Sequence, residues 1–366
     1  MAHTESQCPT GRHRRHTCRI IGHLGLTKAR QERIFERISR AYKNFTMAAP
    51  SESPFTIGPL GDAMPLYCPR TRLPLYFENG KLVTRPSDGS APQIWGYSNG
   101  FPDLIEGQRF EDAIDSKCRC YEACSNEYST EHYWIPLMRQ LFKDRDPNLP
   151  PPRLLSVGCG IGVEVDLLCQ AGFACYGVDN GNRTLDWPAR QHTKGLMLAN
   201  AMHLPFADAS FDVVFCGCVF PHVGVVGDSR TPAPTCEADR AKLAADMIRV
   251  LKPGGYTVAC SPNRFFPFDL FHDRVHGTYI PPYNSPFSRF LMSIGDYRSM
   301  FTKAGCQWVK SLPVEGFWGF VTMRKSLKGR LLSTPIRISF KLASLSWLKF
   351  LRYSPFVPWI AVIGRK

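Results

Sequence analysis

A glycine-rich turn, placed between an apolar run and a segment with helical apolar spacing, constrains the fold of this chain most. Residues 153–157 read Arg-Leu-Leu-Ser-Val, residues 158–162 read Gly-Cys-Gly-Ile-Gly, and apolar side chains then recur three and four residues apart. This order predicts a buried strand, a tight loop and a helix. Glycine accepts positive φ and lets a ligand lie on the backbone beside the positive helix end. The turn therefore predicts a cofactor site; the alternative is a helix cap with close strand–helix packing.

Three further segments follow in an order that supports a cofactor site. Residues 173–178 predict a second strand that ends at Asp179, about 20 residues after the glycines, where a carboxylate can bind both hydroxyls of a ribose. Residues 200–215 predict a turn and a third strand. Residues 249–259 predict a helix end, a Pro-Gly-Gly turn and a fourth strand. Strands that alternate with helices are typical of a parallel α/β sheet.

These four segments, taken in this order, resemble the class I S-adenosylmethionine (SAM) dependent methyltransferases, especially the quinone-biosynthesis-like branch that includes many small-molecule methyltransferases. The resemblance covers roughly residues 153–310. It implies an α/β fold with a Rossmann-like, seven-stranded, mostly parallel sheet and helices on both faces. The ligand site is then expected at the carboxyl ends of the strands. SAM is the implied cofactor, and methyl transfer is the implied activity.

The resemblance also implies a set of cofactor contacts. They fall on Gly158, Cys159, Gly160, Gly162, Asp179, Asn180, Asn200, Ala201 and Cys216. Two positions depart from the family pattern. Asn200 stands where the family usually has Asp, so its bond to the adenine amine lacks charge assistance. Ser156 stands where many relatives have Asp or Glu, so backbone carbonyls near Gly158 and Cys216 are the expected acceptors for the SAM amino group.

Chemistry is expected beyond the strand that ends near residue 217. Methyl transfer requires positioning and, for an oxygen or nitrogen acceptor, removal of a proton. His222 matches a histidine that is frequent here in the quinone-type branch, and its pKa range suits a general base. The alternative is that His222 only packs or caps the next helix. The Asn/Asp-Pro-Pro-aromatic motif of nucleic-acid amino-methyltransferases and the Pro-Cys dipeptide of pyrimidine C5 methylation are both missing at this place.

A proline- and aromatic-rich insert over about residues 261–290 is predicted to form the acceptor lid. Its aromatic side chains favour an apolar or ring-shaped acceptor, and His272 and His276 are further candidates for proton transfer; the alternative is that the aromatics close the core. The expected acceptor is a small molecule or a lipid- or glycan-linked molecule. A ribosomal RNA base is the alternative acceptor, and a SAM-binding module without turnover is a third hypothesis.

Residues 47–115 are predicted to form a small β-rich unit. It resembles the zinc-ribbon-like domain that precedes some methyltransferase domains, including ribosomal RNA guanine methyltransferases, where the opening reads Cys-Pro-x-Cys. Here Cys68-Pro69 is followed by Thr71, and no Cys-x-x-Cys pair comes before Cys118. A tetrahedral thiolate site needs four ligands, so no metal is expected in this unit.

Positive charge gathers at the two ends of the chain. The formal net charge is +14; residues 1–46 hold ten Lys and Arg against three acids, and residues 321–366 hold ten against none. Residues 47–320 hold 25 basic and 28 acidic side chains, which makes RNA the less expected partner. Residues 1–46 are predicted to be a basic, partly disordered tail with an amphipathic helix.

The methyltransferase domain is expected over residues 116–322, followed by a basic amphipathic segment over residues 323–366. Three placements of that segment stay open: peripheral contact with an anionic membrane, packing on the methyltransferase domain, and pairing of two subunits. Fourteen cysteines, several of them inside predicted core elements, are typical of free thiols in a reducing compartment. No signal-peptide pattern is visible, so a cytoplasmic location is expected. The oligomeric state is not predicted.

Overall fold

The computed structural model describes residues 52–107, 109–110, 116–227, 229–270, 282–317 and 327–366. One sheet of eleven strands crosses the molecule in the order β12-β13-β11-β10-β7-β8-β9-β6-β5-β4-β3. The strands are β3 (Leu75–Glu78), β4 (Lys81–Thr84), β5 (Ile94–Ser98), β6 (Phe101–Leu104), β7 (Arg153–Val157), β8 (Ala174–Asp179), β9 (Leu196–Ala199), β10 (Phe211–Gly217), β11 (Leu251–Pro262), β12 (Trp308–Ser311) and β13 (Trp359–Arg365). A separate pair, β1 (Thr56–Ile57) and β2 (Met64–Pro65), is antiparallel.

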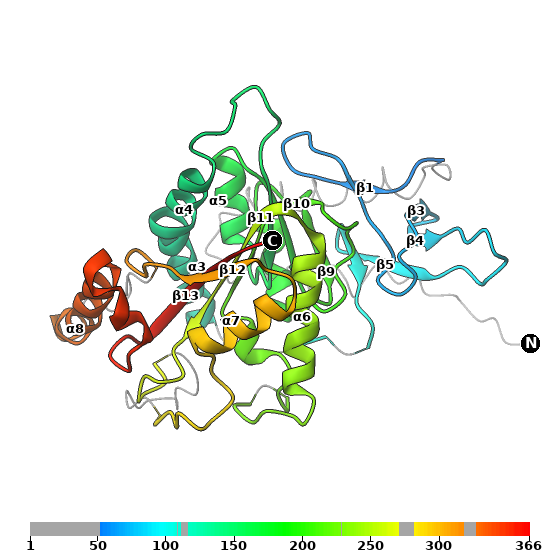
Figure 1. Cartoon of the computed structure of the whole chain (residues 1–366). Helices are drawn as coiled ribbons and strands as arrows, with labels where there is room; N and C mark the ends of the chain where they lie inside the picture. The colour runs from blue at the N-terminus through cyan, green and yellow to red at the C-terminus, as the bar shows by residue number, and fades with distance from the viewer. Residues whose placement is uncertain (1–51, 108, 111–115, 228, 271–281, 318–326) are drawn as a thin grey trace, which may run out of the picture.

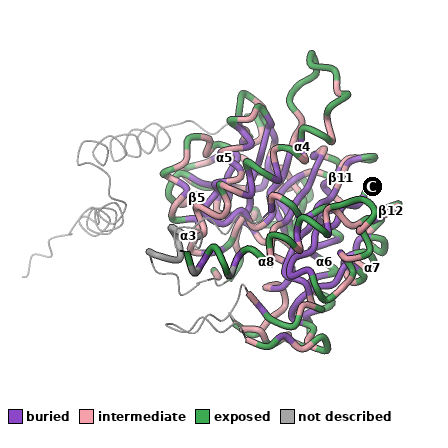
Figure 2. The backbone as a smooth tube through the Cα atoms, turned by 90° about the vertical axis from the view of Figure 1, so that its left-hand side faces the viewer, coloured by how far each residue is buried: buried purple, intermediate pink, exposed green. Residues whose placement is uncertain are grey.

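Helices cover both faces of the sheet (Figure 1). They are α3 (Ser116–Ser129), the π-helical turn η1 (Thr130–Trp134), α4 (Ile135–Leu141), α5 (Val163–Gln170), α6 (Cys236–Val250), α7 (Ile294–Lys303) and α8 (Leu327–Ser344), with short 3-10 segments η2 (Asn182–Ala189), η3 (Phe220–His222) and η5 (Ser346–Tyr353). One apolar cluster lies between the sheet and α6 and α7, and a second lies between the sheet and α4, α5 and α8. The buried backbone accordingly runs through the middle of the molecule (Figure 2).

The predicted α/β sheet is confirmed in strands β7–β13. Strands β7 to β11 pair in parallel, as their apolar composition predicts for a sheet buried on both faces. β13 runs antiparallel between β11 and β12. Seven strands therefore form the Rossmann-like part of the sheet, and six of them are mutually parallel.

The β-rich unit differs from the prediction because it is not separate. β6 pairs in parallel with β9, and β5, β4 and β3 extend the same sheet. Leu66, Leu75 and Trp95 are buried in the same apolar cluster as Leu155 and Val157 of the central strands. Strand pairing and a shared core thus cross the boundary expected at residue 115. Cys68 is buried in this cluster, and its Sγ accepts a hydrogen bond from the Thr71 amide at 3.5 Å.

The boundary expected at residue 322 is also wrong for the sheet, because β13 lies beyond it. Successive side chains of β13 enter the clusters on opposite faces: Ile360 and Val362 lie in one cluster, and Ala361 and Ile363 in the other. An uncharged run that is buried on both faces is the pattern of a central strand. Within the described residues 327–366, most of the exposed side chains lie in α8, η5 and the short link to β13, and Arg365 at the end of β13 is also exposed.

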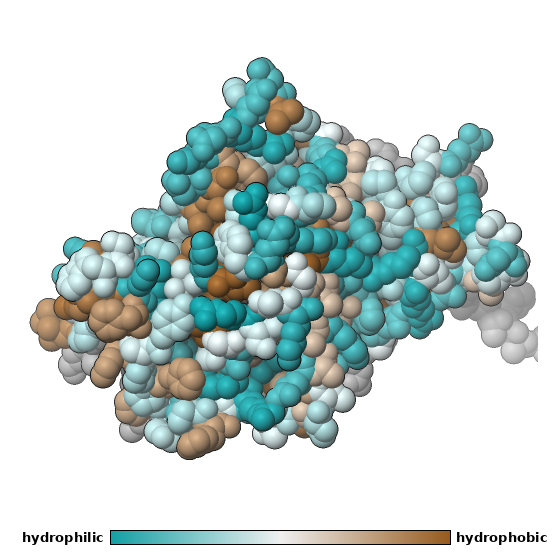
Figure 3. Space-filling model, viewed as in Figure 1, coloured by the Kyte–Doolittle hydropathy of each residue, from teal (hydrophilic) through white to brown (hydrophobic). Residues whose placement is uncertain are grey.

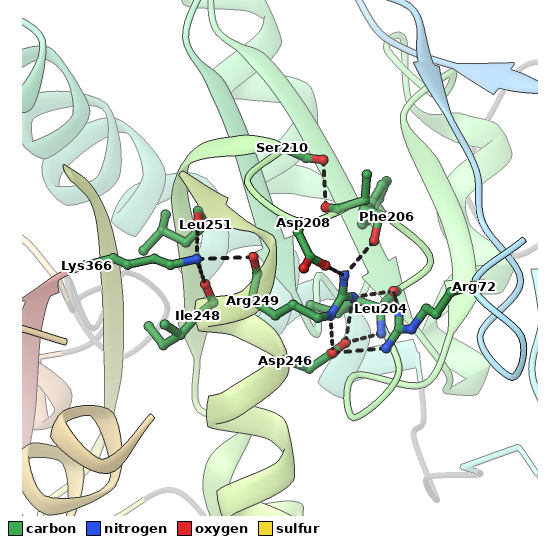
Figure 4. A network of polar contacts seen from close by, with 11 residues as sticks. Arg72, Leu204, Phe206, Asp208, Ser210, Asp246, Ile248, Arg249, Leu251 and Lys366 are labelled. Atoms are coloured by element: carbon green, nitrogen blue, oxygen red, sulfur yellow. Dashed lines mark hydrogen bonds and ion pairs between the residues drawn. The ribbon is translucent and has the colours of Figure 1, made fainter. Parts of the chain in front are cut away.

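A polar network joins the N-terminal strands to α6 (Figure 4). The buried carboxylate of Asp246 accepts from Arg249 at 2.6 Å, from Arg72 at 3.2 Å and from the Leu204 amide. Lys366 donates to the carbonyls of the last turn of α6, among them that of Ile248 at 2.6 Å. A cation at this position stabilises the negative end of the helix.

Several predictions fall outside the described residues. These are the tail and helix within residues 1–46, and the lid histidines His272 and His276.

Of the core cysteines, Cys159, Cys169, Cys175, Cys216 and Cys260 are free and buried, as predicted, whereas Cys218 is half-buried.

Candidate functional site: a cofactor cradle at the strand ends

The glycine turn follows β7, and its backbone explains why all three glycines are needed. Gly158, Gly160 and Gly162 have φ of 74°, 51° and 75°. A Cβ on Gly158 would stand 2.1 Å from Cγ2 of Val219, and one on Gly162 would stand 3.2 Å from the indole of Trp187. Positive φ and close neighbours both exclude larger residues, so the turn presents bare backbone.

Hydrogen bonds hold this turn against β8 and η2. The amides of Gly158 and Cys159 donate to the Val178 carbonyl at 2.8 and 3.0 Å. The indole of Trp187 donates to the Gly160 carbonyl at 2.8 Å. The Cys159 side chain is buried, and burial raises the pKa of its thiol well above the ordinary value. Cys159 therefore contributes its backbone to the site rather than a reactive sulfur.

Asp179 ends β8 directly beside the turn. Its Oδ2 accepts from the Gly160 amide and its Oδ1 from the Gly181 amide, both at 2.8 Å. Burial raises the pKa of the Asp179 carboxyl, and the amide donors oppose that rise. A carboxylate oxygen accepts more than one hydrogen bond, so both oxygens keep capacity for a ligand. The turn and the predicted ribose acceptor are thus in direct contact.

Asn200 and Ala201 follow β9 at the same edge of the sheet, because Asp179 pairs with Leu198 one strand away. The Asn200 Oδ1 atom accepts from the Met202 amide at 2.9 Å, so the side chain stabilises the turn in which Asn200 lies. Its oxygen can accept a second hydrogen bond. The adjoining strand ends therefore bring together Gly158, Cys159, Gly160, Gly162, Asp179, Asn180, Asn200 and Ala201.

Cys216 lies inside β10 on the other side of β7. Its side chain is fully buried, and burial raises the pKa of its thiol to about 12. Only the backbone of Cys216 suits a role at the strand end. Two residues later, Cys218 has a positive φ of 58°, which is uncommon outside glycine. This strained position turns the chain so that Val219 reaches Gly158.

Glu164, in the first turn of α5, is a carboxylate that the family pattern does not single out. Its Oε1 accepts from the Ser156 hydroxyl at 3.0 Å, while Oε2 is buried without a hydrogen-bond partner in the described part of the chain. Burial raises the pKa of this carboxyl to about 7. Ser156 occupies the place where many relatives carry an acid. Here the carboxylate comes instead from the helix, eight residues later, and that spacing is the sequence signal for it.

α3 lies over the glycine turn. Glu122 of α3 pairs with Arg183 of η2 at 3.0 Å, and its Oε1 would lie 3.1 Å from a Cβ on Gly160. The segment before β7 therefore covers the predicted cofactor site. Farther along α3, Tyr128 stacks on His132 at a centroid distance of 4.0 Å.

His222 ends η3, close to the end of the predicted lid. Its half-buried ring meets the Phe290 ring edge-on, with 6.0 Å between centroids. Arg240 of α6 fixes both segments, because its buried guanidinium donates to the Pro221 carbonyl at 3.0 Å and to the Phe290 carbonyl at 2.8 Å. The structure thus places His222 between the strand end and the lid.

Comparison with known proteins agrees with this geometry. Residues 155–259 match the family model described as "Methyltransferase domain". A probable S-adenosylmethionine-dependent methyltransferase of Mycolicibacterium smegmatis is 27% identical over 152 residues, which is 39% of this chain and 54% of that protein. The ubiquinone biosynthesis O-methyltransferase of Hahella chejuensis is 32% identical over 169 residues, 44% of this chain and 63% of that protein.

A solved SAM-dependent methyltransferase of Aquifex aeolicus aligns with 69% of this chain and 98% of its own, at 12% identity and a TM-score of 0.37. The chain spans about half the length of the first curated relatives that it matches. Residues 155–259 thus match a methyltransferase domain, and the curated relatives named here are methyltransferases. S-adenosylmethionine is the cofactor that this domain indicates.

Proposed function

We propose that the protein is a SAM-dependent methyltransferase that acts on a small-molecule or lipid-linked acceptor. The observation that carries the proposal is the convergence of a bare glycine turn, Asp179 and the orphaned oxygen of Glu164 at one edge of the sheet. SAM is a nucleoside joined through a positively charged sulfur to an amino acid. It therefore needs open backbone beside it, an acceptor for its ribose hydroxyls and a buried negative charge for its amino group. The residues present therefore fit SAM.

Each residue has a defined task in this proposal. Asp179 accepts hydrogen bonds from the ribose hydroxyls, Asn200 accepts from the adenine amine, and Glu164 balances the charge of the amino group. The glycine turn leaves room for the methionine part. When bound, SAM supplies a methyl group on a positively charged sulfur. For an oxygen or nitrogen acceptor, His222 receives the acceptor proton.

The first prediction is that the full chain binds SAM or its demethylated product in calorimetry. Asp179→Asn is expected to weaken binding at least about tenfold, because a charge-assisted hydrogen bond contributes about 1.5–3 kcal/mol. This variant keeps one acceptor oxygen, which can serve the Gly160 amide, while the contact with the Gly181 amide is lost. Asp144→Ala, in an exposed turn, serves as control and should bind like the unmodified protein. Absence of binding by the intact chain would end the proposal.

The second prediction concerns the acceptor. SAM with a labelled methyl group, incubated with the protein and extracts of the source cell, is expected to label the small-molecule or lipid fraction. His222→Gln should lower incorporation by about tenfold or more without changing SAM affinity, if the acceptor atom is oxygen or nitrogen. Label in RNA, with binding that falls steeply as salt rises, would overturn the acceptor class. Tight SAM binding without label in any fraction would indicate a module without turnover.

A further inference from the structure

α8 has apolar side chains on two opposite faces. One face packs on the protein, where Phe340 and Ala343 are buried in the core. The other consists of Leu327, Leu331, Ile338 and Leu342, which are 71, 68, 53 and 41% exposed, and Leu345, which is 37% exposed, follows directly after the helix. Separations of four, seven and four residues keep the first four on one line along the helix. An ordinary surface helix has a single apolar face, so this second stripe needs its own explanation.

Exposed aromatic side chains continue the stripe. η5 and the link to β13 expose Trp347, Phe350, Tyr353 and Phe356, and the insert after β11 exposes Phe265, Phe268, Tyr283 and Phe287, the last at 92%. The two segments are neighbours, because the Asn263 amide donates to the carbonyls of Ser354 and Val357 at 3.0 and 2.8 Å. Figure 3 shows hydrophobic surface gathered around α8 and below it. We call these residues, together with the α8 stripe, the apolar surface.

Basic side chains flank the apolar surface. Arg337, Lys341 and Lys349 are exposed, and each directly precedes a member of the apolar surface in the sequence. On a helix, a residue one position earlier lies about 100° around the axis, so Arg337 and Lys341 form a parallel row beside Ile338 and Leu342. The sequence has no Asp or Glu from residue 316 to residue 366. The charge of this region therefore complements an anionic surface.

The apolar surface is also held rigidly. Arg352 is buried and donates to the Ala343 carbonyl at 2.7 Å and to the Ser311 carbonyl at 3.1 Å. The Ser344 hydroxyl accepts from the amides of Val314 and Glu315. These bonds fix the end of α8 to the catalytic sheet. Among the described residues, no helix is both long and apolar enough to cross a bilayer.

We propose that the apolar surface docks the protein on an anionic lipid bilayer, with α8 lying in the plane of the interface. A basic row beside a stripe of Leu, Ile, Trp and Phe is the composition of an interfacial helix. Each Lys or Arg near an anionic leaflet contributes attraction, and the apolar side chains enter the headgroup region. The docking itself does not rest on methyl transfer. It adds to the proposed function a position for the described aromatic residues of the insert after β11, which would face the lipid.

Co-sedimentation of the full chain with vesicles tests the docking. Binding is expected to vesicles of phosphatidylcholine with phosphatidylserine, to fall with added salt, and to be at least about tenfold weaker with phosphatidylcholine alone. The charge reversal Arg337→Glu with Lys341→Glu, and the apolar change Trp347→Ser with Phe350→Ser, should each lower binding by about tenfold or more. All four side chains are exposed, so both variants should fold. Truncation before α8 is unsuitable because it also removes β13.

The matched control variants change exposed residues of β4, β5 and α7. Lys81→Glu with Lys303→Glu reverses two exposed charges, and Ile94→Ser removes an apolar side chain that is 62% exposed. Both controls should bind vesicles like the unmodified chain. Docking is overturned if the full chain stays in solution with anionic vesicles at low salt, if the controls fall as far as the variants, or if the apolar surface proves to hold a dimer in light scattering. SAM calorimetry on the same samples reports separately on the proposed function.

Discussion

Replacing Asp246 by alanine is expected to lower the free energy of unfolding by about 1–3 kcal/mol, because it removes a buried carboxylate partner from the half-buried Arg249 and the more exposed Arg72. Asp246 is 7% exposed. Arg249 reaches it from α6 and Arg72 from the loop between β2 and β3, and the Leu204 amide donates to it from the loop before β10. One carboxylate thus serves three segments of the chain (Figure 4). Its loss also leaves the Leu204 amide unpaired.

Urea denaturation of Asp246→Ala, Asp246→Asn and Asp208→Ala measures this effect. Asp208 binds the same Arg249 at 2.8 Å, but its side chain is 77% exposed. Pairs of this kind contribute about 0–1 kcal/mol, so Asp208→Ala is the matched control. Asp246→Asn keeps the volume and an acceptor oxygen, and its loss should fall between the other two. A loss for Asp246→Ala no larger than that for Asp208→Ala would contradict a structural role for the buried charge.

The glycine turn and Asp179 were predictable because their signals are local. A tight turn needs glycine at positions with positive φ, and the three glycines stand at such positions. The acid at the end of the next strand must lie close to the turn, since parallel neighbours end at the same edge. The contact between the Asp179 carboxylate and the Gly160 amide follows from that topology.

The ends of the sheet were not predictable because their pairing is not local. Residues 359–364 form an uncharged run, but nothing in it specifies a place between β11 and β12. Trp359 pairs with Pro262, close to one hundred residues earlier. β6 likewise joins β9 across the whole of α3 and β7. Composition assigned both segments to surface or accessory units, whereas strand pairing and burial place them in the main sheet.

Glu164 shows a third kind of limit, in which a carboxylate stands at another position than the one the resemblance points to. The family pattern directs attention to residue 156, where this chain has serine. The structure shows that the nearest carboxylate belongs to α5 and is bonded to that serine. The pair can be recognised only when strand end and helix start are seen together. Its unpaired oxygen then has a measurable consequence for stability.

Glu164→Gln is expected to stabilise the cofactor-free protein above pH 7 by up to about 3 kcal/mol and to leave its stability near pH 4.5 unchanged. Burial raises the pKa of this carboxyl from 4.5 to about 7. Between these values the folded state holds a proton that the unfolded state has released, so stability falls as pH rises through this window. A shift of this size corresponds to about 3 kcal/mol. Glutamine removes the penalty because it never ionises.

The same substitution is expected to weaken SAM binding at least about tenfold at pH 7.5, because the amino group loses its charged partner. Below pH 7, SAM binding by the unmodified chain should release a proton, visible as a dependence of the calorimetric enthalpy on the buffer, and the variant should lose that dependence. Urea denaturation from pH 4.5 to 8.5 gives the stability comparison. Glu127→Gln, at an exposed position on α3, is the control for both measurements. A gain in stability with unchanged affinity would mean that the orphaned oxygen is not an anchor for the cofactor, and equal pH profiles would mean that the carboxyl is solvated.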